Sequence, residues 1–455
     1  MIGILAIVSL GFINTTDLLE HEKPVYIPPS KQRTGDAAAG YIYLTTGDYL
    51  KSGIPYVFFN LGMPKDTSNH LQRSGLNASL PHDFTAVKAP NGEMIVAPNC
   101  LQCHAQLFDG KLVVGLGNSF SDFTVNRQGI ALAAEGFLKN LKGDQKKKYD
   151  AAKNFITSLK IISPKLITGT KGVNLADGLA ALLVSHRDPA TLQWSDKNLL
   201  ELPDEIIPTD VPAWWLLKKK HGMFYNGFGR GDFGRFLMAS NLLTVTDTAE
   251  AAEVDTHFND VLAFINSIEA PKFPQAINQA KATAGQEIFE ATCAKCHGTY
   301  GANGQYPNLL IPESIIKTDS ALYTSNYSNP QFVQWFNKSW FTTGDHPAQL
   351  VPYRGYIAPP LDGIWITAPY LHNGSVPSLD AVLNSKARPA FWQRSFSKPS
   401  YNYDIPGWNY KTKDAPGGTE VYNTTLKGYG NYGHTFADKL SPAERSAVIE
   451  YLKTL

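Results

Sequence analysis

Hydrophobic and polar positions along the chain predict helices separated by long, turn-rich segments. The Ala-, Leu- and Lys-rich stretch 129–159 has a helical composition that is interrupted near Gly143 and Asp144. Further helices are expected over 175–184, over 248–268 with Asp247 as N-cap, over 282–291, from Asn329-Pro330 onward and over 378–383.

Turn residues dominate the rest of the chain. Segments 41–98 and 341–440 indicate little regular structure apart from one short strand at 93–96 and the short helix at 378–383, and Asp109-Gly110 marks a turn before an apolar run. Ser441, Pro442 and Glu444 carry the capping-box signature of a C-terminal helix. These patterns predict a mainly α fold with long loops and little β structure.

Length and composition narrow the class of protein. At about 150 residues per domain, 455 residues predict two or three domains, and 43% hydrophobic residues are typical of a globular chain. Lys plus Arg is 41 and Asp plus Glu is 40, which argues against a nucleic-acid binder.

Pro271 and Pro274 mark a boundary between two domains. We therefore expect a leader or tether over 1–40 and domains over 41–270 and 271–455.

The four cysteines form two Cys-x-x-Cys pairs, and a histidine follows each pair directly. This is the attachment signature of c-type haem. The two thiols form thioethers with the two vinyl groups of one haem, and the adjacent histidine ligates the iron. The sequence thus predicts two covalently bound haems, one in each domain. The predicted attachment residues are Cys100, Cys103 and His104 for the first haem, and Cys293, Cys296 and His297 for the second.

Other uses of Cys-x-x-Cys fit the chain less well. A zinc site needs two pairs about 15 to 20 residues apart, whereas Cys103 and Cys293 lie in different halves. A thioredoxin-type pair does not account for two copies that both end in histidine. Disulfides within each pair would close very small loops.

Attachment of c-type haem takes place outside the cytoplasm, so we expect a periplasmic or secreted protein. The apolar run 2–13 is long enough for the core of a signal peptide but shorter than the about 20 residues that span a bilayer. It lacks a basic start and a clear cleavage site, which leaves the true N-terminus open. No later segment has the composition of a membrane span.

The sixth iron ligand decides what each haem does, because Met or His closes the iron whereas an empty position admits small molecules. No methionine follows Cys293, so the second haem is expected to use a histidine. We favour His434, because Gly430 and Gly433 let the backbone come close to a flat ring. The other candidates in this half are His346 and His372.

The sixth ligand of the first haem stays open. An empty position is as acceptable as a ligand from the same half, and spacing does not distinguish the candidates. They are Met63, Met94, Met223, Met238, His70, His82, His186 and His221.

Paired tryptophans, Trp214 and Trp215, stand out between the two motifs. Such residues usually belong to a core, and the alternative is an aromatic bridge that relays electrons between haems. Arg230 and Arg235 follow in a Gly-rich stretch and are candidates for pairing with a haem propionate.

Three features together resemble the di-haem cytochrome c peroxidase superfamily, and within it the rubber oxygenase-like di-haem c-type cytochromes. They are the two haem motifs, the Trp-Trp-Leu-Leu-Lys segment from Trp214, and the segment 360–379 with its Ala-Pro-Tyr-Leu-His-Asn-Gly-Ser-Val-Pro run. The resemblance implies two cytochrome c-like domains, His434 as sixth ligand of the second haem, and Trp215 as the inter-haem residue with Trp214 in reserve. It also implies a reactive first haem with an open or weakly filled sixth position. Calcium is a further candidate cofactor.

The chain also departs from these relatives. The Trp-Asp-Gly-Arg segment of the bacterial peroxidases is absent after the first motif, and their distal glutamate has no clear counterpart. Activity on polyisoprene does not follow from likeness of fold.

We expect an exported di-haem oxidoreductase. Its second haem would exchange electrons with a first haem that binds oxygen or peroxide, and a small redox protein or another electron donor or acceptor would be its partner. The alternative is a pure electron-transfer cytochrome in which both haems are six-coordinate.

Overall fold

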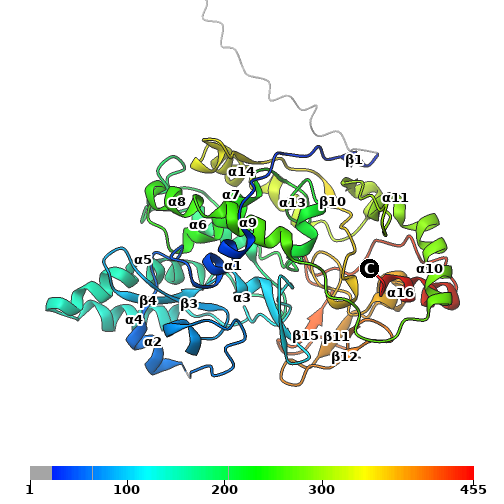
Figure 1. Ribbon diagram of the computed structural model, residues 1–455, viewed down its shortest axis with the longest axis horizontal. Helices are drawn as coiled ribbons and strands as arrows, with labels where there is room; N and C mark the ends of the chain where they lie inside the picture. Colours follow the sequence, from blue (N-terminus) through cyan, green and yellow to red (C-terminus); the bar gives the residue numbers. More distant parts are fainter. Residues whose placement is uncertain (1–22, 64, 203) are drawn as a thin grey trace, which may run out of the picture.

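The computed structural model describes residues 23–63, 65–202 and 204–455 (Figure 1). Helices hold 38% of the residues and strands 13%, in agreement with a mainly α fold. The apolar run 2–13 lies outside the described residues. None of the helices in the described part combines the length and the apolar run that crossing a bilayer requires.

The first half contains helices and a few short strands. Its α-helices are α1 (Ala37–Thr46), α2 (Tyr56–Gly62), α3 (Leu101–His104), α4 (Gln128–Lys139), α5 (Lys146–Ile162), α6 (Ala176–Val184), α7 (Phe233–Leu237), α8 (Thr248–Asp255) and α9 (Phe258–Ser267). Its 3₁₀ helices are η2 (Gly75–Ser79), η3 (Gly143–Gln145), η4 (Trp214–Lys219) and η5 (Met238–Leu243). Its strands are β1 (Val25–Tyr26), β2 (Ile54–Pro55), β3 (Phe84–Lys88), β4 (Met94–Pro98), β5 (Ala105–Phe108), β6 (Lys111–Val114) and β7 (Gly229–Gly231).

The second half mixes helices with very short strands. Its α-helices are α10 (Gln279–Thr292), α11 (Ala294–His297), α12 (Glu313–Ile316), α13 (Ala321–Ser328), α14 (Pro330–Asn337), α15 (Leu379–Leu383) and α16 (Pro442–Leu452). Its 3₁₀ helices are η6 (Trp340–Thr342), η7 (Ile364–Ile366) and η8 (Ser385–Ala387). Its strands are β8 (Leu309–Pro312), β9 (Ala348–Leu350), β10 (Gly355–Ile357), β11 (Phe391–Arg394), β12 (Tyr401–Asn402), β13 (Gly407–Trp408), β14 (Tyr410–Thr412) and β15 (Val421–Asn423).

Most of the predicted helices are confirmed. The break between α4 and α5 falls at Gly143, and Ser441 caps α16 in a complete capping box with Glu444. The helix expected over 248–268 is instead two helices, because the chain breaks between Asp255 and Phe258, although Asp247 caps the first of them as expected.

The expectation of little regular structure over 41–98 is wrong. This segment contains α2 and a three-stranded antiparallel sheet in the order β2-β4-β3. The central residues of β3 and β4 are all buried, so the strands show no alternation of polar and apolar positions. The segment 341–440 likewise holds strands from β9 to β15, mostly of two or three residues, which are too short to show a period of two.

Two large hydrophobic clusters divide the interior. The larger contains Leu101, beside the first haem motif, and the second contains Phe289, just before the second motif. The larger cluster also takes in side chains from η6, α14 and β9, which follow Pro271 in the chain. The boundary near Pro271 stays a prediction, because the core around the first motif also uses residues from the second half.

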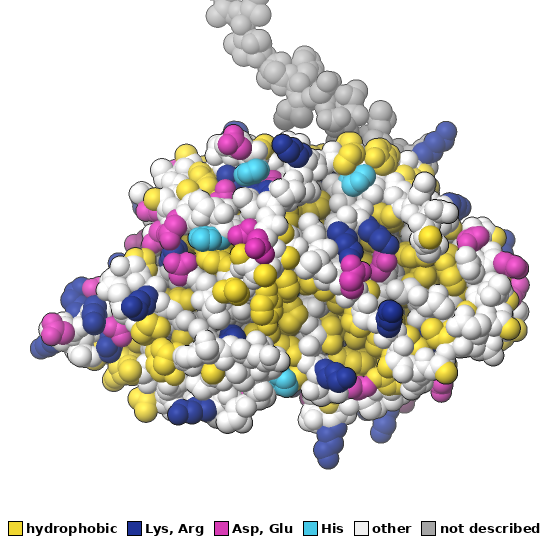
Figure 2. Space-filling model, in the orientation of Figure 1, with side chains coloured by type: hydrophobic (Ala, Val, Ile, Leu, Met, Phe, Trp, Pro, Cys, Tyr) yellow, Lys and Arg dark blue, Asp and Glu magenta, His cyan; other side chains and the backbone are white. Residues whose placement is uncertain are grey.

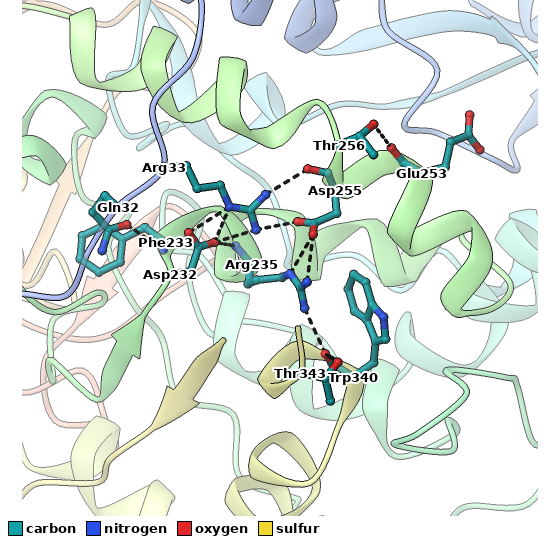
Figure 3. Close-up of polar contacts among 10 residues, drawn as sticks. All are labelled: Gln32, Arg33, Asp232, Phe233, Arg235, Glu253, Asp255, Thr256, Trp340 and Thr343. Carbon is teal, nitrogen blue, oxygen red and sulfur yellow. Dashed lines mark hydrogen bonds and ion pairs between the residues drawn. The ribbon is translucent and has the colours of Figure 1, made fainter. Parts of the chain in front are cut away.

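The segment before α1 runs extended across both halves. β1 pairs antiparallel with β8 of the second half, and Arg33 then inserts among helices of the first half. Figure 3 shows the Arg33 guanidinium between Asp232 and Asp255, to which it lies at 2.8 Å and 2.6 Å. Asp255 also pairs with Arg235 at 2.9 Å, and the Arg235 guanidinium lies 4.0 Å from the ring centroid of Trp340. These buried charges compensate each other, as burial of ions requires.

Helices α10 and α16 pack at very close range, and this contact positions the second haem motif at the end of α10 (Figure 1). A Cβ atom added at Gly285 on α10 would lie 1.9 Å from the carbonyl oxygen of Ala447 on α16. Only glycine therefore allows the two helices to approach in this way.

Gly285→Ala is expected to destabilise the protein by about 1–3 kcal/mol, because the new methyl group forces the helices apart. Gly136→Ala on α4 is the matched control, since nothing lies within 4 Å of the added carbon there. The control is expected to be neutral or to stabilise by up to about 1 kcal/mol. Urea unfolding curves measure both, and equal midpoints for the two variants would contradict the prediction.

Candidate functional site

The first motif lies on α3, directly after β4. Asn99 fixes the start of the motif: its side chain accepts a hydrogen bond from the Leu101 backbone N–H at 2.8 Å and donates to the carbonyl of His82 and to the hydroxyl of Thr85, both at 2.9 Å. After the motif the chain forms the β5–β6 hairpin. Asp109 and Gly110 make its turn with φ values of 47° and 77°, as a two-residue hairpin turn requires.

The cysteines of the first motif lie in a desolvated setting and form no disulfide with each other. Burial raises the pKa of Cys100 to about 11 and also raises the pKa of Cys103. The side-chain amide of Asn174 lies 3.2 Å from the Cys103 sulfur. Both cysteines are half-buried and not packed over completely.

His104 stacks on Trp214, with ring centroids 4.5 Å apart and an interplanar angle of 16°. Burial lowers the pKa of His104 to about 3, which keeps the imidazole neutral, the form that ligates iron. The backbone joins the same two residues, because the Gly115 N–H donates to the His104 carbonyl and the Trp214 N–H donates to the Gly115 carbonyl, each at 2.8 Å.

The second motif follows α10 without a break, and Cys293 ends that helix. His297 on α11 has its Nδ1 atom 2.8 Å from the carbonyl oxygen of Pro359. This contact fixes the plane of the imidazole and leaves Nε2 free for a metal, the arrangement typical of a ligating histidine.

His434 faces His297 with ring centroids 6.2 Å apart. A metal–imidazole bond of about 2 Å, and about 1 Å from ring nitrogen to centroid, place two trans imidazoles about 6 Å apart. The two rings are inclined at 60°, and their separation would allow His297 and His434 to hold one haem iron between them. His372, the other candidate in a tight loop, is instead hydrogen-bonded through Nε2 to the Tyr356 hydroxyl at 3.0 Å and stacks on that ring.

Backbone geometry brings His434 to this position. His434 itself has a φ of 44°, and its N–H donates to the carbonyl of Ile316 at 2.9 Å. A Cβ atom added at Gly433 would lie 2.2 Å from the carbonyl oxygen of Lys317, so a glycine is required there. Arg388 donates to the carbonyls of Asn431, Gly433 and His434 and holds the loop together.

Trp214 and Trp215 point into different clusters. Trp214 belongs to the larger cluster, whereas Trp215 belongs to the second cluster and is 1% exposed. The Trp215 indole N–H donates to the carbonyl of Asp362 at 2.8 Å. Pro359, whose carbonyl orients His297, lies three residues before Asp362, so one short loop contacts both Trp215 and the second motif.

The remaining candidates are placed as follows. Met223 and Met238 are buried in the larger cluster, whereas Met63 and His70 are exposed. Arg235 is paired with Asp255, and Arg230 has no carboxylate within 4 Å among the described residues. No three His, Cys, Asp or Glu side chains gather as a metal site in the described ranges, so the calcium ion stays a prediction without a ligand set.

A cavity of about 440 Å³ adjoins His297. Its walls come from β1, the end of the η4 segment and the loop after the second motif. Among the residues lining it are Tyr26, Lys219, His221, Tyr300 and Tyr306.

Two family models match the second half of the chain. A cytochrome c oxidase, cbb3-type, subunit III model covers residues 280–333, which include the second motif, and a RoxA-like, cytochrome c-like model covers residues 355–393. Residues 280–333 and 355–393 are therefore similar to cytochrome c domains. This cytochrome c-like region implies covalent haem c and electron transfer as its chemistry, and it contains Pro359 and Asp362. The first motif and His434 lie outside both matched ranges.

Two proteins of Sinorhizobium fredii are similar to the chain. The uncharacterised protein y4iJ is 42% identical over 110 residues, which are 22% of this chain and 18% of that protein. The uncharacterised protein y4iM is 24% identical over 263 residues, which are 51% of this chain and 58% of that protein. The chain thus covers less than two thirds of either relative.

If His434 is the sixth ligand of a haem bound at the second motif, His434→Ala is expected to turn that haem from low-spin to high-spin, because its iron would lose this ligand. The absorption and electron paramagnetic resonance spectra of the purified holoprotein report this change, and the mass should still show two haems because the cysteines are intact. His372→Ala is the matched control. A high-spin signal in His372→Ala but not in His434→Ala would assign the ligand to His372.

Proposed function

We propose that the protein is an exported di-haem c-type cytochrome oxidoreductase. One haem is held by Cys293, Cys296 and His297 with His434 as sixth ligand, and the other by Cys100, Cys103 and His104. Electrons pass between the two, and the first haem binds oxygen or peroxide. A bound haem supplies the redox iron, while the residues between the motifs supply the electron path.

The tryptophan pair carries this proposal. Trp214 stacks on His104, the proposed ligand of the first iron, while its neighbour Trp215 is hydrogen-bonded to the loop whose Pro359 carbonyl orients His297. A protein with two independent haems has no need for buried aromatic side chains that connect the ligands of both. The continuity from His104 to His297 therefore supports exchange of electrons between the motifs.

A pure electron-transfer cytochrome is the second candidate, and one observation favours it. Met238 is 2% exposed in the same cluster as Leu101 and begins η5, and the hydroxyl of Ser240 in η5 contacts the Cys100 thiol. A buried thioether in the same cluster and on the same 3₁₀ helix as a residue that contacts the motif is a candidate sixth ligand that would close the iron and raise its potential.

Ligand binding by the holoprotein distinguishes the two functions. If the first haem is open, we expect a high-spin ferric band and a spectral shift of one of the two haems on addition of cyanide, carbon monoxide or peroxide. Met238→Leu should leave this response unchanged. The pure electron-transfer function would be assigned by two results together: a wholly low-spin spectrum that does not change when these ligands are added, and a high-spin signal in Met238→Leu.

Trp215→Phe and Trp214→Phe are each expected to slow electron transfer between the haems by about tenfold or more, a barrier increase of about 1.4 kcal/mol. Stopped-flow absorption after partial reduction measures the rate. Trp365→Phe is the matched control, because Trp365 is buried in the same cluster as Trp215 and its N–H likewise donates to a carbonyl, that of Pro271. If the rate of electron transfer between the haems is the same in all three variants, Trp214 and Trp215 are not part of the electron path.

A further inference from the structure

Helices α2 and α4 expose an unusual number of large apolar side chains. The most exposed are Leu61 at 84% and Ile130 at 72%, and Phe137 follows at 56%. We call these residues, with their exposed neighbours on the two helices, the α2–α4 face. It consists of Val57, Leu61, Met63, Ile130, Leu132 and Phe137.

The helical period places Ile130 and Phe137 on one side of α4, whereas Leu132 is exposed on another side of the same helix. Ile130, Ala133 and Phe137 follow each other at spacings of three and four residues and are all exposed, whereas Ala131 and Leu138 are buried in a small cluster with α5. Phe58 of α2 meets Phe137 edge to face at 5.1 Å, which joins the two helices. Among the described residues, nothing covers the outer side of either helix.

Lysines surround the face. From Arg127 to Lys165 the sequence has nine Lys or Arg residues against three Asp or Glu residues, although the whole chain is nearly neutral. Lys139, Lys146 and Lys147 are more than half exposed, and each also pairs with a carboxylate, of Glu135, Asp150 and Glu93 respectively. Lys142 is exposed in the connection between α4 and α5, with no carboxylate within 4 Å among the described residues. Figure 2 shows basic side chains next to hydrophobic ones at the end of the molecule formed by α4 and α5.

The position and charge of the face identify the kind of surface it fits. Figure 1 shows α4 at one end of the molecule, beyond α3 and far from α11, so a redox partner that docked there would be badly placed for electron exchange with the second motif. A second copy would bring two basic faces together across a twofold axis, and like charges repel. Apolar side chains that project from a basic surface are instead the features that bind an anionic membrane interface.

We propose that the α2–α4 face docks the protein on the surface of an anionic lipid bilayer. Leu61, Ile130 and Phe137 enter the interfacial layer, and the lysines around them contact lipid phosphate groups. Both haem motifs then stay on the aqueous side, because α3 lies near the centre of the molecule and α11 toward the end opposite α4 (Figure 1).

Vesicle sedimentation of the holoprotein tests the proposal. Vesicles of phosphatidylglycerol and phosphatidylcholine in equal parts should bind the protein at low salt, and binding should weaken above about 0.1 M salt, where charges are screened beyond about 10 Å. Pure phosphatidylcholine vesicles should bind it far less. Equal binding to both kinds of vesicle, or binding that does not depend on the salt concentration, would overturn the proposal.

Variants assign the binding to this face. Leu61→Asn with Ile130→Asn should reduce binding by about tenfold or more, and Lys142→Glu or Lys146→Glu alone by about fivefold or more each. These side chains are exposed, so the haem spectra and the thermal midpoint should not change. Ile42→Asn on α1 is the matched control, since Ile42 is 63% exposed but lies outside the face.

Two results would overturn the assignment. The first is vesicle binding that the Leu61 and Ile130 substitutions leave unchanged while Ile42→Asn lowers it. The second is a dimer in sedimentation velocity that only the Leu61 and Ile130 substitutions dissociate, which would assign the face to a second copy of the chain.

Discussion

Trp214 and Trp215 are consecutive residues of η4, yet their side chains pack in different hydrophobic clusters. The two clusters therefore cannot move apart without exposing one indole, and loss of a buried tryptophan costs about 3–5 kcal/mol. The same residues contact His104 on one side and the Asp362 carbonyl on the other. This constraint fixes the relation between the two proposed haem sites, and it would hold them at a constant distance during electron exchange.

The N-terminal segment reinforces that relation from outside. β1 pairs with β8 near the loop after the second motif, and Arg33 is buried against Asp232 and Asp255 near α7 and α8 (Figure 3). A buried cation between two carboxylates is stable only while all three stay together, because an unpaired charge inside a protein costs several kcal/mol. Tyr26 of β1 also lines the cavity beside His297. The segment thus joins the two halves and forms part of a wall at the second motif.

Sequence patterns predicted the parts of the fold that depend on local chemistry. The capping box at Ser441, the Asp109-Gly110 turn and the long α4–α5 pair follow from side chains next to one another in the chain. The short strand expected at 93–96 corresponds to β4, whereas β3 was missed because the burial of its central residues removes the alternation that marks a strand. α1 was missed as well, although Asp36 caps it, because it lies at the edge of the segment interpreted as a tether.

The candidate sites divide in the same way. Spacing predicts the motif cysteines and histidines, and the flanking glycines favour His434; their roles as haem ligands stay predictions. The carbonyls of Pro359 and Asp362 could not be predicted from the sequence. The backbone of every residue offers a carbonyl acceptor, and only the fold decides which carbonyl meets a ring nitrogen. Asn99 had a weak signal, because an Asn directly before a helical motif is a common cap residue.

The two sites differ in how much of the ligand geometry exists before haem binds. Around the second motif, the Pro359 carbonyl orients the His297 ring, and the Arg388 guanidinium binds three carbonyls of the His434 loop. The loop fixes the backbone of His434, whose own Nδ1 is buried without a hydrogen-bond partner among the described residues. At the first motif, His104 Nδ1 is buried without a hydrogen-bond partner, and the stacked Trp214 ring orients the imidazole through dispersion. An imidazole without a hydrogen-bonded Nδ1 is a weaker electron donor to iron than one with such a bond. This asymmetry favours the division of roles proposed above, with a rigid electron-transfer site at the second motif and a more adaptable iron at the first.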